Sequence, residues 1–376
     1  MRCRGKLFRG NIWTEVGGDP LDHKRVLIGM SGGVDSAAVA VLLQQAGYEA
    51  VGCTLRLFRN DNAGDCGSSK DVEDARAVAQ RLGMSFYEFD FSERFCRCVM
   101  DDFVACYRAG RTPNPCIQCN RHIKFDALLR KADELGIGYI ATGHYARIKY
   151  DETTGRWQLL RGKDRAKDQS YVLYPLTQYQ LSRLKMPVGE YEKTAIRAIA
   201  EERGLINARK KDSQDICFVP DGDYTAFLQH YGGVTLVPGN FVDTAGKVLG
   251  SHRGLECYTT GQRRGLGVSA DRPLYVLCKN SERNEVVLGD ERELYSRTVW
   301  AEYFNWVSVA PAAEPMSVTA KTRYSQKEAA ATVYPEENGL VRVEFDEPQR
   351  AVTAGQALVT YQGEVVVGGG TICRWA

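Results

Sequence analysis

Hydrophobic residues in the first 150 positions fall into short apolar runs, separated by stretches with helical spacing. Four runs have the length and continuity of buried parallel strands, at 25–30, 49–57, 85–91 and 139–142. The stretches between them predict helices at 37–46, 71–83, 93–109 and 123–135. Strands that alternate with helices favour an α/β fold built on a doubly wound parallel sheet.

The pattern changes after residue 150. Helices are predicted at 176–184, 192–203 and 224–230, with loops between them. Later, short strands alternate with Gly, Asp and Asn turns, at 240–248, 283–288, 340–345, 357–361 and 364–367. We therefore expect a disordered leader at 1–23, the doubly wound domain at 24–175, a small helical central region at 176–236 and a C-terminal β-barrel at 237–376.

Charge is unevenly distributed along the chain. The 376 residues include 49 basic and 47 acidic side chains, a net charge of +2. The stretch 104–131 carries +5 and the stretch 141–211 carries +7, which leaves −10 for the rest. A basic surface suits a polyanion, although ordinary solvated helix faces give the same pattern. Charge alone leaves both interpretations open.

The twelve cysteines are too sparse for a small disulfide scaffold. The chain contains no 18-residue apolar stretch, and its N-terminus lacks the apolar core of a secretory signal, so we expect no membrane contact. These features favour a cytoplasmic protein with reduced thiols. Cysteines with a special task would then be catalytic, redox-active or metal-binding.

A glycine-rich loop lies between the first predicted strand and the first predicted helix. Its residues are Gly29, Met30, Ser31, Gly32, Gly33, Val34, Asp35 and Ser36. The glycines allow backbone N–H groups to converge on an anion, and the helix that follows offers its positive end. The loop has no lysine, unlike the common nucleotide loop that ends in Gly-Lys-Ser/Thr. Asp35 suits a Mg²⁺, ribose or phosphate contact.

Three cysteines lie in basic sequence contexts. Cys116 and Cys119 form a C-x-x-C between Arg111 and Arg121, and positive charge favours the reactive thiolate. The pair by itself is compatible with half a zinc site, a redox pair or an iron–sulfur site. Cys217 follows a run of three basic residues, but its neighbours Ile216 and Phe218 are equally compatible with a buried packing role.

The order of the motifs resembles one family. The segment Ser31–Ser36 is similar to the loop of pyrophosphatase-type ATP enzymes, which form adenylated intermediates. This loop and four later motifs, taken in order, resemble the tRNA-specific 2-thiouridylases. The later motifs are Gly-Arg-Thr-Pro-Asn-Pro at 110–115, Ala-Thr-Gly-His-Tyr at 141–145, Lys-Asp-Gln-Ser-Tyr at 167–171 and Asp-Ser-Gln-Asp-Ile-Cys-Phe at 212–218. The likeness continues through 258–267, 321–324 and 352–356.

The resemblance implies an ATP-dependent tRNA sulfurtransferase that adenylates the wobble uridine and replaces its C2 oxygen with sulfur. Cys119 and Cys217 would be catalytic, with Cys217 carrying the incoming sulfur as a persulfide. The sulfur donor would be a persulfide carrier protein or, if an iron–sulfur cluster replaces the persulfide, sulfide. Leu55 and Gly143 would join the loop in binding ATP with Mg²⁺. Residues matched to tRNA-facing positions are Asn114, Pro115, Cys116, His144, Lys167, Asp168, Gln169, Arg323, Tyr324 and Gln356.

Cys116 departs from the family pattern, in which many members carry aspartate at this position. A thiol cannot simply take over the general-base role of a carboxylate. Three converging thiolates on Cys116, Cys119 and Cys217 would suit a [4Fe–4S] cluster with one open iron, and this is an alternative hypothesis to the persulfide route. Other candidates are an adenylating ligase with a small-molecule substrate and a non-catalytic iron–sulfur or RNA-binding regulator.

Overall fold

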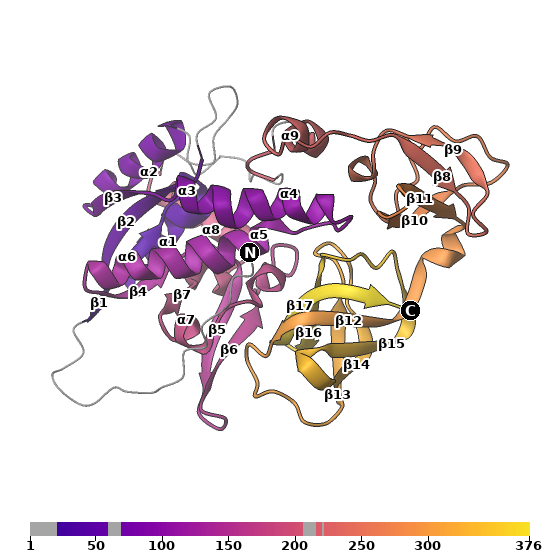
Figure 1. Ribbon diagram of the computed structural model, residues 1–376. Helices are drawn as coiled ribbons and strands as arrows, with labels where there is room; N and C mark the ends of the chain where they lie inside the picture. The colour runs from indigo at the N-terminus through magenta and orange to yellow at the C-terminus, as the bar shows by residue number, and fades with distance from the viewer. Residues whose placement is uncertain (1–20, 59–68, 206–215, 220–221) are drawn as a thin grey trace.

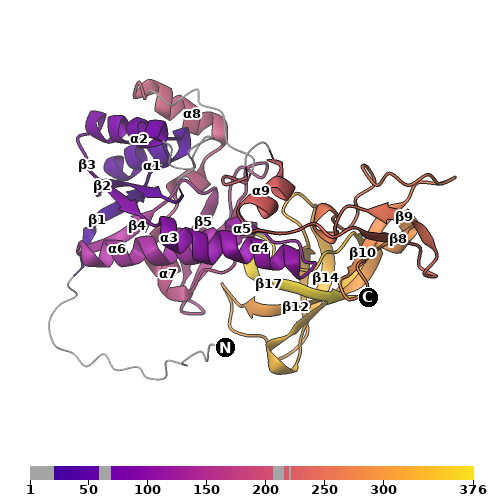
Figure 2. The ribbon, with the colours of Figure 1, turned by 45° about the horizontal axis from the view of Figure 1, so that its top comes forward.

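The computed structural model describes residues 21–58, 69–205, 216–219 and 222–376. It contains a parallel sheet flanked by helices, a four-stranded sheet and a closed barrel (Figure 1). The last two lie beside each other, and the helix pair α3 (Ser92–Phe95) and α4 (Asp101–Arg108) extends toward them from the parallel sheet (Figure 2). The proposed leader lies outside the described residues, apart from its last three positions.

The first sheet confirms the predicted doubly wound fold. Its order is β3-β2-β1-β4-β7 and every pairing is parallel. The strands are β1 (Asp22–Gly29), β2 (Glu49–Arg56), β3 (Ser85–Asp90), β4 (Ile137–Ala141) and β7 (Leu184–Lys185). Alternate β1 residues point to opposite faces, so that Leu27 joins one core and Val26 and Ile28 join the other.

Helices cover both faces of this sheet and fill the central region. They are α1 (Val34–Gln45), α2 (Ser69–Arg81), α5 (Pro115–Cys119), α6 (Leu128–Glu134), α7 (Gln178–Ser182), α8 (Lys193–Glu202) and α9 (Tyr224–His230). π-helical segments at Cys96–Met100 and Asn120–Ala127 join α3 to α4 and α5 to α6. The helices predicted at 93–109 and 123–135 are thus present, each with a π-helical part.

The C-terminal part contains two β units. The smaller sheet has the order β10-β11-β8-β9, with β8 (Gly239–Val242), β9 (Val248–His252), β10 (Tyr275–Asn280) and β11 (Glu285–Gly289). The single strand predicted at 240–248 is wrong, because a turn separates β8 from β9. In that turn the Asp243 carboxylate accepts from two backbone N–H groups and Gly246 has φ +84°.

The barrel closes through pairing of β12 (Tyr295–Asn305) with β17 (Val365–Trp375). Between them in space lie β15 (Val341–Arg350), β14 (Ala329–Pro335), β13 (Met316–Lys321) and β16 (Ala357–Gln362). The hairpin β5 (Ala146–Asp151) and β6 (Arg156–Arg161), which the sequence pattern did not reveal, continues from β17. One apolar cluster contains Leu27 of the parallel sheet together with Val359 and Tyr361 of the barrel, so the two units share a core.

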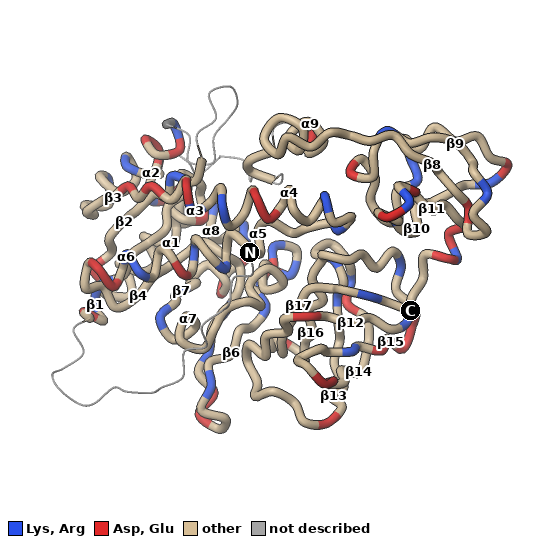
Figure 3. Tube along the Cα trace, viewed as in Figure 1, with Lys and Arg blue, Asp and Glu red and all other residues tan. Residues whose placement is uncertain are grey.

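Ion pairs also join the hairpin region to the barrel. Arg147 and Arg165 both pair with Glu364, and Arg161 pairs with Glu328. Basic and acidic positions are interspersed along the chain (Figure 3). Part of the positive charge of the stretch 141–211 therefore serves contacts within the protein. The described helices include none with the length and apolar composition of a membrane span.

Candidate active site

The predicted phosphate loop lies between the end of β1 and the start of α1. Gly32 has φ +68°, and a Cβ atom there would lie 2.7 Å from the Asp71 carbonyl oxygen, so this position requires glycine. The Ser36 hydroxyl donates to the Gly33 carbonyl (3.1 Å) and accepts from the Ser31 N–H (3.3 Å). The loop thus opens a twelve-residue helix whose N-terminal N–H groups and dipole favour an anion.

Asp35 is held by two side chains from outside the loop. The Lys193 ammonium lies 2.8 Å from each carboxylate oxygen, and the Tyr145 hydroxyl donates to one of them at 2.8 Å. Sequence reasoning identified neither partner. Tyr145 lay within a quoted motif, but Lys193 is 158 residues from Asp35 and carried no local signal.

Gly143 packs against the loop, and Leu55 lies in the neighbouring strand; that both bind ATP stays a prediction. Leu55 is near the carboxyl end of β2, and Gly143 follows β4. A Cβ atom on Gly143 would lie 3.1 Å from Asp35 Cβ and from the Ser36 nitrogen, so the glycine permits close packing of the loop. In parallel sheets, ligands bind at this edge, outside the carboxyl ends of the strands.

The two C-x-x-C cysteines are placed differently by the short helix α5. Asn114 is its N-cap and Pro115 its first residue, where proline is well tolerated. Cys116 is exposed, whereas Cys119 is 7% exposed within an aromatic cluster. The i, i+3 spacing places both thiols on the same side of the helix, and the packing of Cys119 into the apolar cluster leaves only Cys116 exposed to solvent.

Cys217 is exposed, on the described segment 216–219. Its neighbour Phe218 packs against Phe95 and Phe103, with ring centroids 5.7 and 5.3 Å apart. Phe218 and Cys119 belong to the same apolar cluster. The structure thus brings the Cys217 segment against the cluster that contains Cys119, although 98 residues separate the two cysteines.

Tyr324, which is predicted to contact tRNA, lies against Asp168 and near Cys116. The Tyr324 hydroxyl donates to the Asp168 carbonyl at 3.2 Å. Burial raises the pKa of Tyr324, and the nearby Asp168 and Cys116 raise it further. Tyr324 remains 44% exposed and packs edge-on against Tyr171. Three predicted site residues from separate segments therefore meet here.

Hydrogen bonds from the barrel side hold the segment that leads into α5. The Gln356 side-chain amide donates to the carbonyls of Thr112 (2.9 Å) and Pro113 (3.2 Å), and the Thr112 N–H donates to the Ala354 carbonyl (2.9 Å). Gly355 has φ +89°, and a Cβ atom there would lie 2.9 Å from the Thr112 oxygen. These contacts fix the position of the segment before Cys116.

Three residues predicted to face tRNA have polar groups that form hydrogen bonds within the protein. They are Gln356, His144 and Arg323. His144 is buried, its Nδ1 lies 2.8 Å from the Thr142 hydroxyl, and burial lowers its pKa well below the ordinary value. Arg323 donates to the carbonyls of Thr260 (3.0 Å) and Ala351 (2.7 Å). Their contacts with tRNA stay predictions.

The loop that carries Lys167, Asp168 and Gln169 is internally braced. The Asp168 carboxylate accepts from the backbone N–H groups of Gly162 (2.9 Å) and Ser170 (3.1 Å). The backbone N–H of Lys167 donates to the Asp164 carboxylate at 3.2 Å. The backbone of this loop is therefore fixed, and its contacts with tRNA stay predictions.

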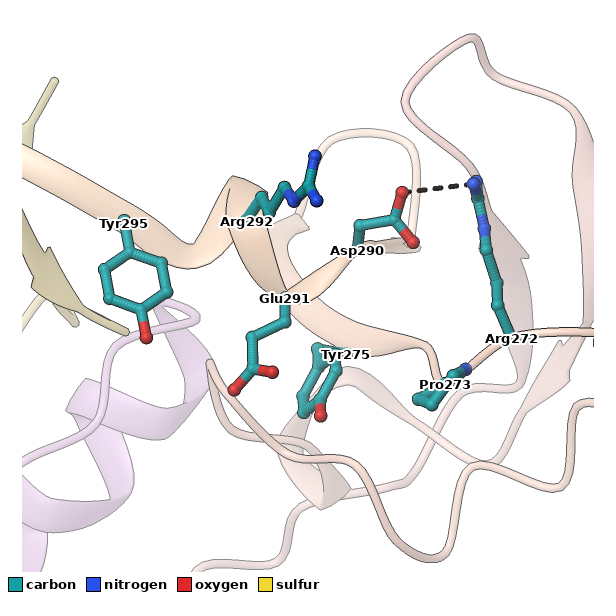
Figure 4. A pocket seen from close by; sticks show the side chains of 7 residues that line it. All are labelled: Arg272, Pro273, Tyr275, Asp290, Glu291, Arg292 and Tyr295. Carbon is teal, nitrogen blue, oxygen red and sulfur yellow. Dashed lines mark ion pairs between the residues drawn. The ribbon is translucent and has the colours of Figure 1, made fainter.

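Two cavities lie between described residues. One, of about 50 Å³, lies between α4, α5 and the barrel, and Asn114, Gln118 and Arg121 are among its lining residues. The other, of about 530 Å³, is lined by Arg272, Pro273, Tyr275, Asp290, Glu291, Arg292 and Tyr295 (Figure 4). It lies where the four-stranded sheet meets β12, and none of the predicted site residues lines it.

Known proteins match nearly the whole chain. Three family models match consecutive parts of it. They describe a tRNA methyl transferase HUP domain at residues 24–221, a tRNA methyl transferase PRC-barrel domain at 225–290 and an aminomethyltransferase beta-barrel domain at 296–372. The tRNA-specific 2-thiouridylase MnmA of Acetivibrio thermocellus is 49% identical over 358 residues, which cover 94% of this chain and 100% of that protein. The MnmA of Moorella thermoacetica is 51% identical over 351 residues, covering 92% and 98%. The chain belongs to the tRNA-specific 2-thiouridylase family.

This family assignment confirms the resemblance expected from the motifs. Among solved structures, the U34-tRNA thiolase NcsA from Methanococcus maripaludis with its [4Fe-4S] cluster is 18% identical, with a TM-score of 0.34 and coverage of 57% of this chain and 69% of that one. At that score the likeness carries no argument about the site of this 2-thiouridylase family member.

An iron–sulfur cluster and a Mg²⁺ ion would each need side chains grouped as metal ligands. Across residues 21–58, 69–205, 216–219 and 222–376, no three or more His, Cys, Asp or Glu side chains are grouped as metal ligands. Cys116, Cys119 and Cys217 all lie in these ranges, so their arrangement does not fit a three-thiolate cluster. Both oxygens of Asp35 contact Lys193, so a Mg²⁺ ion at this carboxylate would require Lys193 to move.

Proposed function

We propose that this chain is an ATP-dependent tRNA sulfurtransferase that forms 2-thiouridine at the wobble position. Membership of the 2-thiouridylase family supports the reaction class. The structural observation that carries the proposal concerns Leu55. This residue is partly buried between the sheet core and the cluster that contains Cys119, so the predicted nucleotide edge and the predicted sulfur chemistry adjoin.

In the proposed reaction, O2 of the uridine attacks the α-phosphate of ATP and pyrophosphate leaves. The C2 oxygen, a poor leaving group, becomes part of AMP, a good one. The loop 29–36 would hold the departing anion with backbone N–H groups and the α1 dipole. Catalysis of this step is mostly positioning and electrostatic stabilisation.

The second step exchanges oxygen for sulfur. The terminal sulfur of a Cys217 persulfide attacks C2, and AMP leaves with the original oxygen. The Cys119 thiolate then attacks the Cys217 sulfur, so that the S–S bond breaks, the terminal sulfur stays on C2 and a Cys119–Cys217 disulfide forms. Two electrons from an external thiol reductant restore both cysteines. The exposure of Cys217 supports loading in the cytoplasm by a persulfide carrier protein, whose terminal sulfur moves to the Cys217 thiolate while the carrier's own cysteine leaves as a thiolate.

Mass spectrometry of tRNA nucleosides tests this proposal. Cells that lack the gene should lose 2-thiouridine, and wild-type protein should restore it. Cys119→Ala and Cys217→Ala should each fail to restore it, whereas Cys116→Ala should succeed at least in part. Restoration by Cys119→Ala would contradict the two-cysteine route.

The remaining alternatives predict different results. A cluster on three thiolates predicts that Cys116→Ala also fails, with loss of iron and visible absorbance after anaerobic reconstitution. A small-molecule ligase predicts pyrophosphate release that is indifferent to bulk tRNA and stimulated by an amino acid. A non-catalytic regulator predicts tRNA binding without pyrophosphate release. The 2-thiouridylase proposal requires pyrophosphate release that depends on tRNA.

A further inference from the structure

A buried lysine from a distant segment reaches the phosphate loop. Lys193 is the first residue of α8, and its side chain is only 10% exposed. Its ammonium lies 2.8 Å from both Asp35 oxygens and 5.6 Å from the centre of the Tyr145 ring. The family resemblance gave this residue no role, and the loop sequence itself contains neither lysine nor arginine.

Packing alone does not explain a charged side chain at this position. Removing an ammonium and a carboxylate from water costs several kcal/mol per ion by general estimates, and replacing such a pair by apolar residues is often neutral or stabilising. Asp35 also gives the loop 29–36 a net negative charge, which would repel a triphosphate. Lys193 offsets that charge at the place where a polyphosphate must bind.

We propose that Lys193 is a catalytic cation that binds the polyphosphate of ATP and the pyrophosphate released from it. In the nucleotide-free state its ammonium is held by Asp35. When ATP binds, the ammonium keeps one carboxylate oxygen and donates to a phosphate oxygen in place of the other. A charge-assisted hydrogen bond from this largely buried ammonium strengthens as negative charge accumulates on the leaving pyrophosphate.

The backbone of Lys193 is anchored to the loop that contains Lys167. The Asp164 carboxylate accepts from the backbone N–H of Lys193 at 3.0 Å and from that of Lys167 at 3.2 Å. The Lys163 N–H also donates to the Gly189 carbonyl, just before α8. Lys193 is therefore fixed at its main chain, and only its four-carbon stem has to adjust when the nucleotide binds.

The test uses Lys193→Met and Lys193→Arg in the full-length protein. Binding of ATP and of inorganic pyrophosphate is measured by calorimetry, and pyrophosphate release by single-turnover kinetics with tRNA. Lys193→Met should weaken both ligands at least about 10-fold and slow release about 100-fold or more, the usual effect of removing an electrostatic stabiliser. Lys193→Arg should recover most of the binding. Lys149→Met, an exposed lysine on β5, should leave all three measurements unchanged.

A second variant separates binding from folding. Lys193→Met leaves Asp35 without its buried ion pair, whereas the double variant Asp35→Asn, Lys193→Met removes both charges. The double variant should fold, as followed by circular dichroism, and still bind pyrophosphate weakly. Wild-type pyrophosphate affinity in either folded variant would overturn the proposal. Failure of both variants to fold would also overturn it, by assigning Lys193 to folding.

This inference rests on the proposed function, but the two can fail separately. Ligand binding is measured without tRNA, so it does not depend on the acceptor. If the wild-type protein makes no 2-thiouridine while Lys193→Met still loses ATP and pyrophosphate binding, the sulfurtransferase proposal fails and the role of Lys193 stands. If the wild-type protein makes 2-thiouridine and Lys193→Met binds and releases pyrophosphate normally, the role of Lys193 fails and the sulfurtransferase proposal stands.

Discussion

Tyr145 and Gln169 are joined by two hydrogen bonds. The Tyr145 N–H donates to the Gln169 side-chain oxygen at 3.0 Å, and the Gln169 N–H donates to the Tyr145 carbonyl at 2.9 Å. The Tyr145 hydroxyl then donates to Asp35. One tyrosine thus connects the loop predicted to contact tRNA with the phosphate loop, which offers a physical route by which tRNA binding influences adenylation.

Gln169→Leu should uncouple these two loops. The substitution removes the acceptor of the Tyr145 N–H and leaves that group unpaired, which costs about 1–3 kcal/mol of unfolding free energy. The stimulation of pyrophosphate release by tRNA should fall several-fold, while ATP binding without tRNA changes little. Urea unfolding and pyrophosphate release measure the two effects. Gln169→Glu, which keeps the acceptor oxygen, is the control, and equal tRNA stimulation in both variants would contradict the coupling.

A methyl group at Gly355 should disturb, from the barrel side, the segment that leads into α5 and its two cysteines. Gly355→Ala would place Cβ against the Thr112 carbonyl and force a strained φ of +89°. We expect a loss of about 1–3 kcal/mol of unfolding free energy and a marked loss of 2-thiouridine formation with ATP binding intact.

Gly363→Ala is the matched control for this substitution. Gly363 also belongs to the barrel and has φ +55°, but a Cβ atom there would meet no atom within 4 Å. This variant therefore carries the backbone strain without the clash. Equal losses of 2-thiouridine formation in the two alanine variants would show that the contact with Thr112 does not position the cysteines.

Much of the α/β domain could be predicted because parallel strands buried on both faces appear as continuous apolar runs. The run 25–30 and the helix after it placed the phosphate loop correctly, and Gly32 has the left-handed backbone that the glycines suggested. The hairpin β5–β6 was missed, although β5 alternates apolar and charged residues along its six positions. Its partner β6 breaks that alternation with two adjacent leucines, so the pair does not show a continuous two-residue period.

The site was less predictable, because a motif identifies a residue but not the direction of its side chain. Arg323 and Gln356 are part of recognisable motifs, yet both donate to main-chain carbonyls of other segments. Lys193 shows the opposite case, since it meets Asp35 only through the packing of α8 against α1. Contacts between distant segments arise from the tertiary fold, which no local pattern encodes.

Arg323 should act as a connector between the two β units. Its guanidinium donates to Thr260, next to the four-stranded sheet, and to Ala351 and Thr353 of the barrel side. Arg323→Leu would remove the donor that joins these three acceptors, of which the Ala351 carbonyl keeps a hydrogen bond from the Thr353 hydroxyl. We expect a loss of about 1–3 kcal/mol in urea unfolding. Arg323→Lys should recover only part of the lost stability, because an ammonium lacks the planar fork of donors that a guanidinium has. Full stability of Arg323→Leu would exclude this connecting role.

Lys279 should make stability rise with pH in the alkaline range. Burial lowers the pKa of Lys279 to about 8, while its ammonium donates to the Tyr258 carbonyl at 3.1 Å. The unfolded chain, with an ordinary lysine pKa of 10.5, binds more protons than the folded state between these two values. The free energy of unfolding contributed by this group therefore increases as the pH rises from about 8 toward 10.5.

Comparison with Lys279→Met isolates this contribution from the other titrating groups. The stability of wild type relative to the variant should increase by about 1–3 kcal/mol between about pH 7.5 and about pH 10, since each pKa unit corresponds to about 1.4 kcal/mol. Urea unfolding under reducing conditions at several pH values measures it. Lys149→Met, which removes an exposed lysine, should show no such trend. A difference between wild type and Lys279→Met that stays constant with pH would show that Lys279 keeps its ordinary pKa in the folded protein.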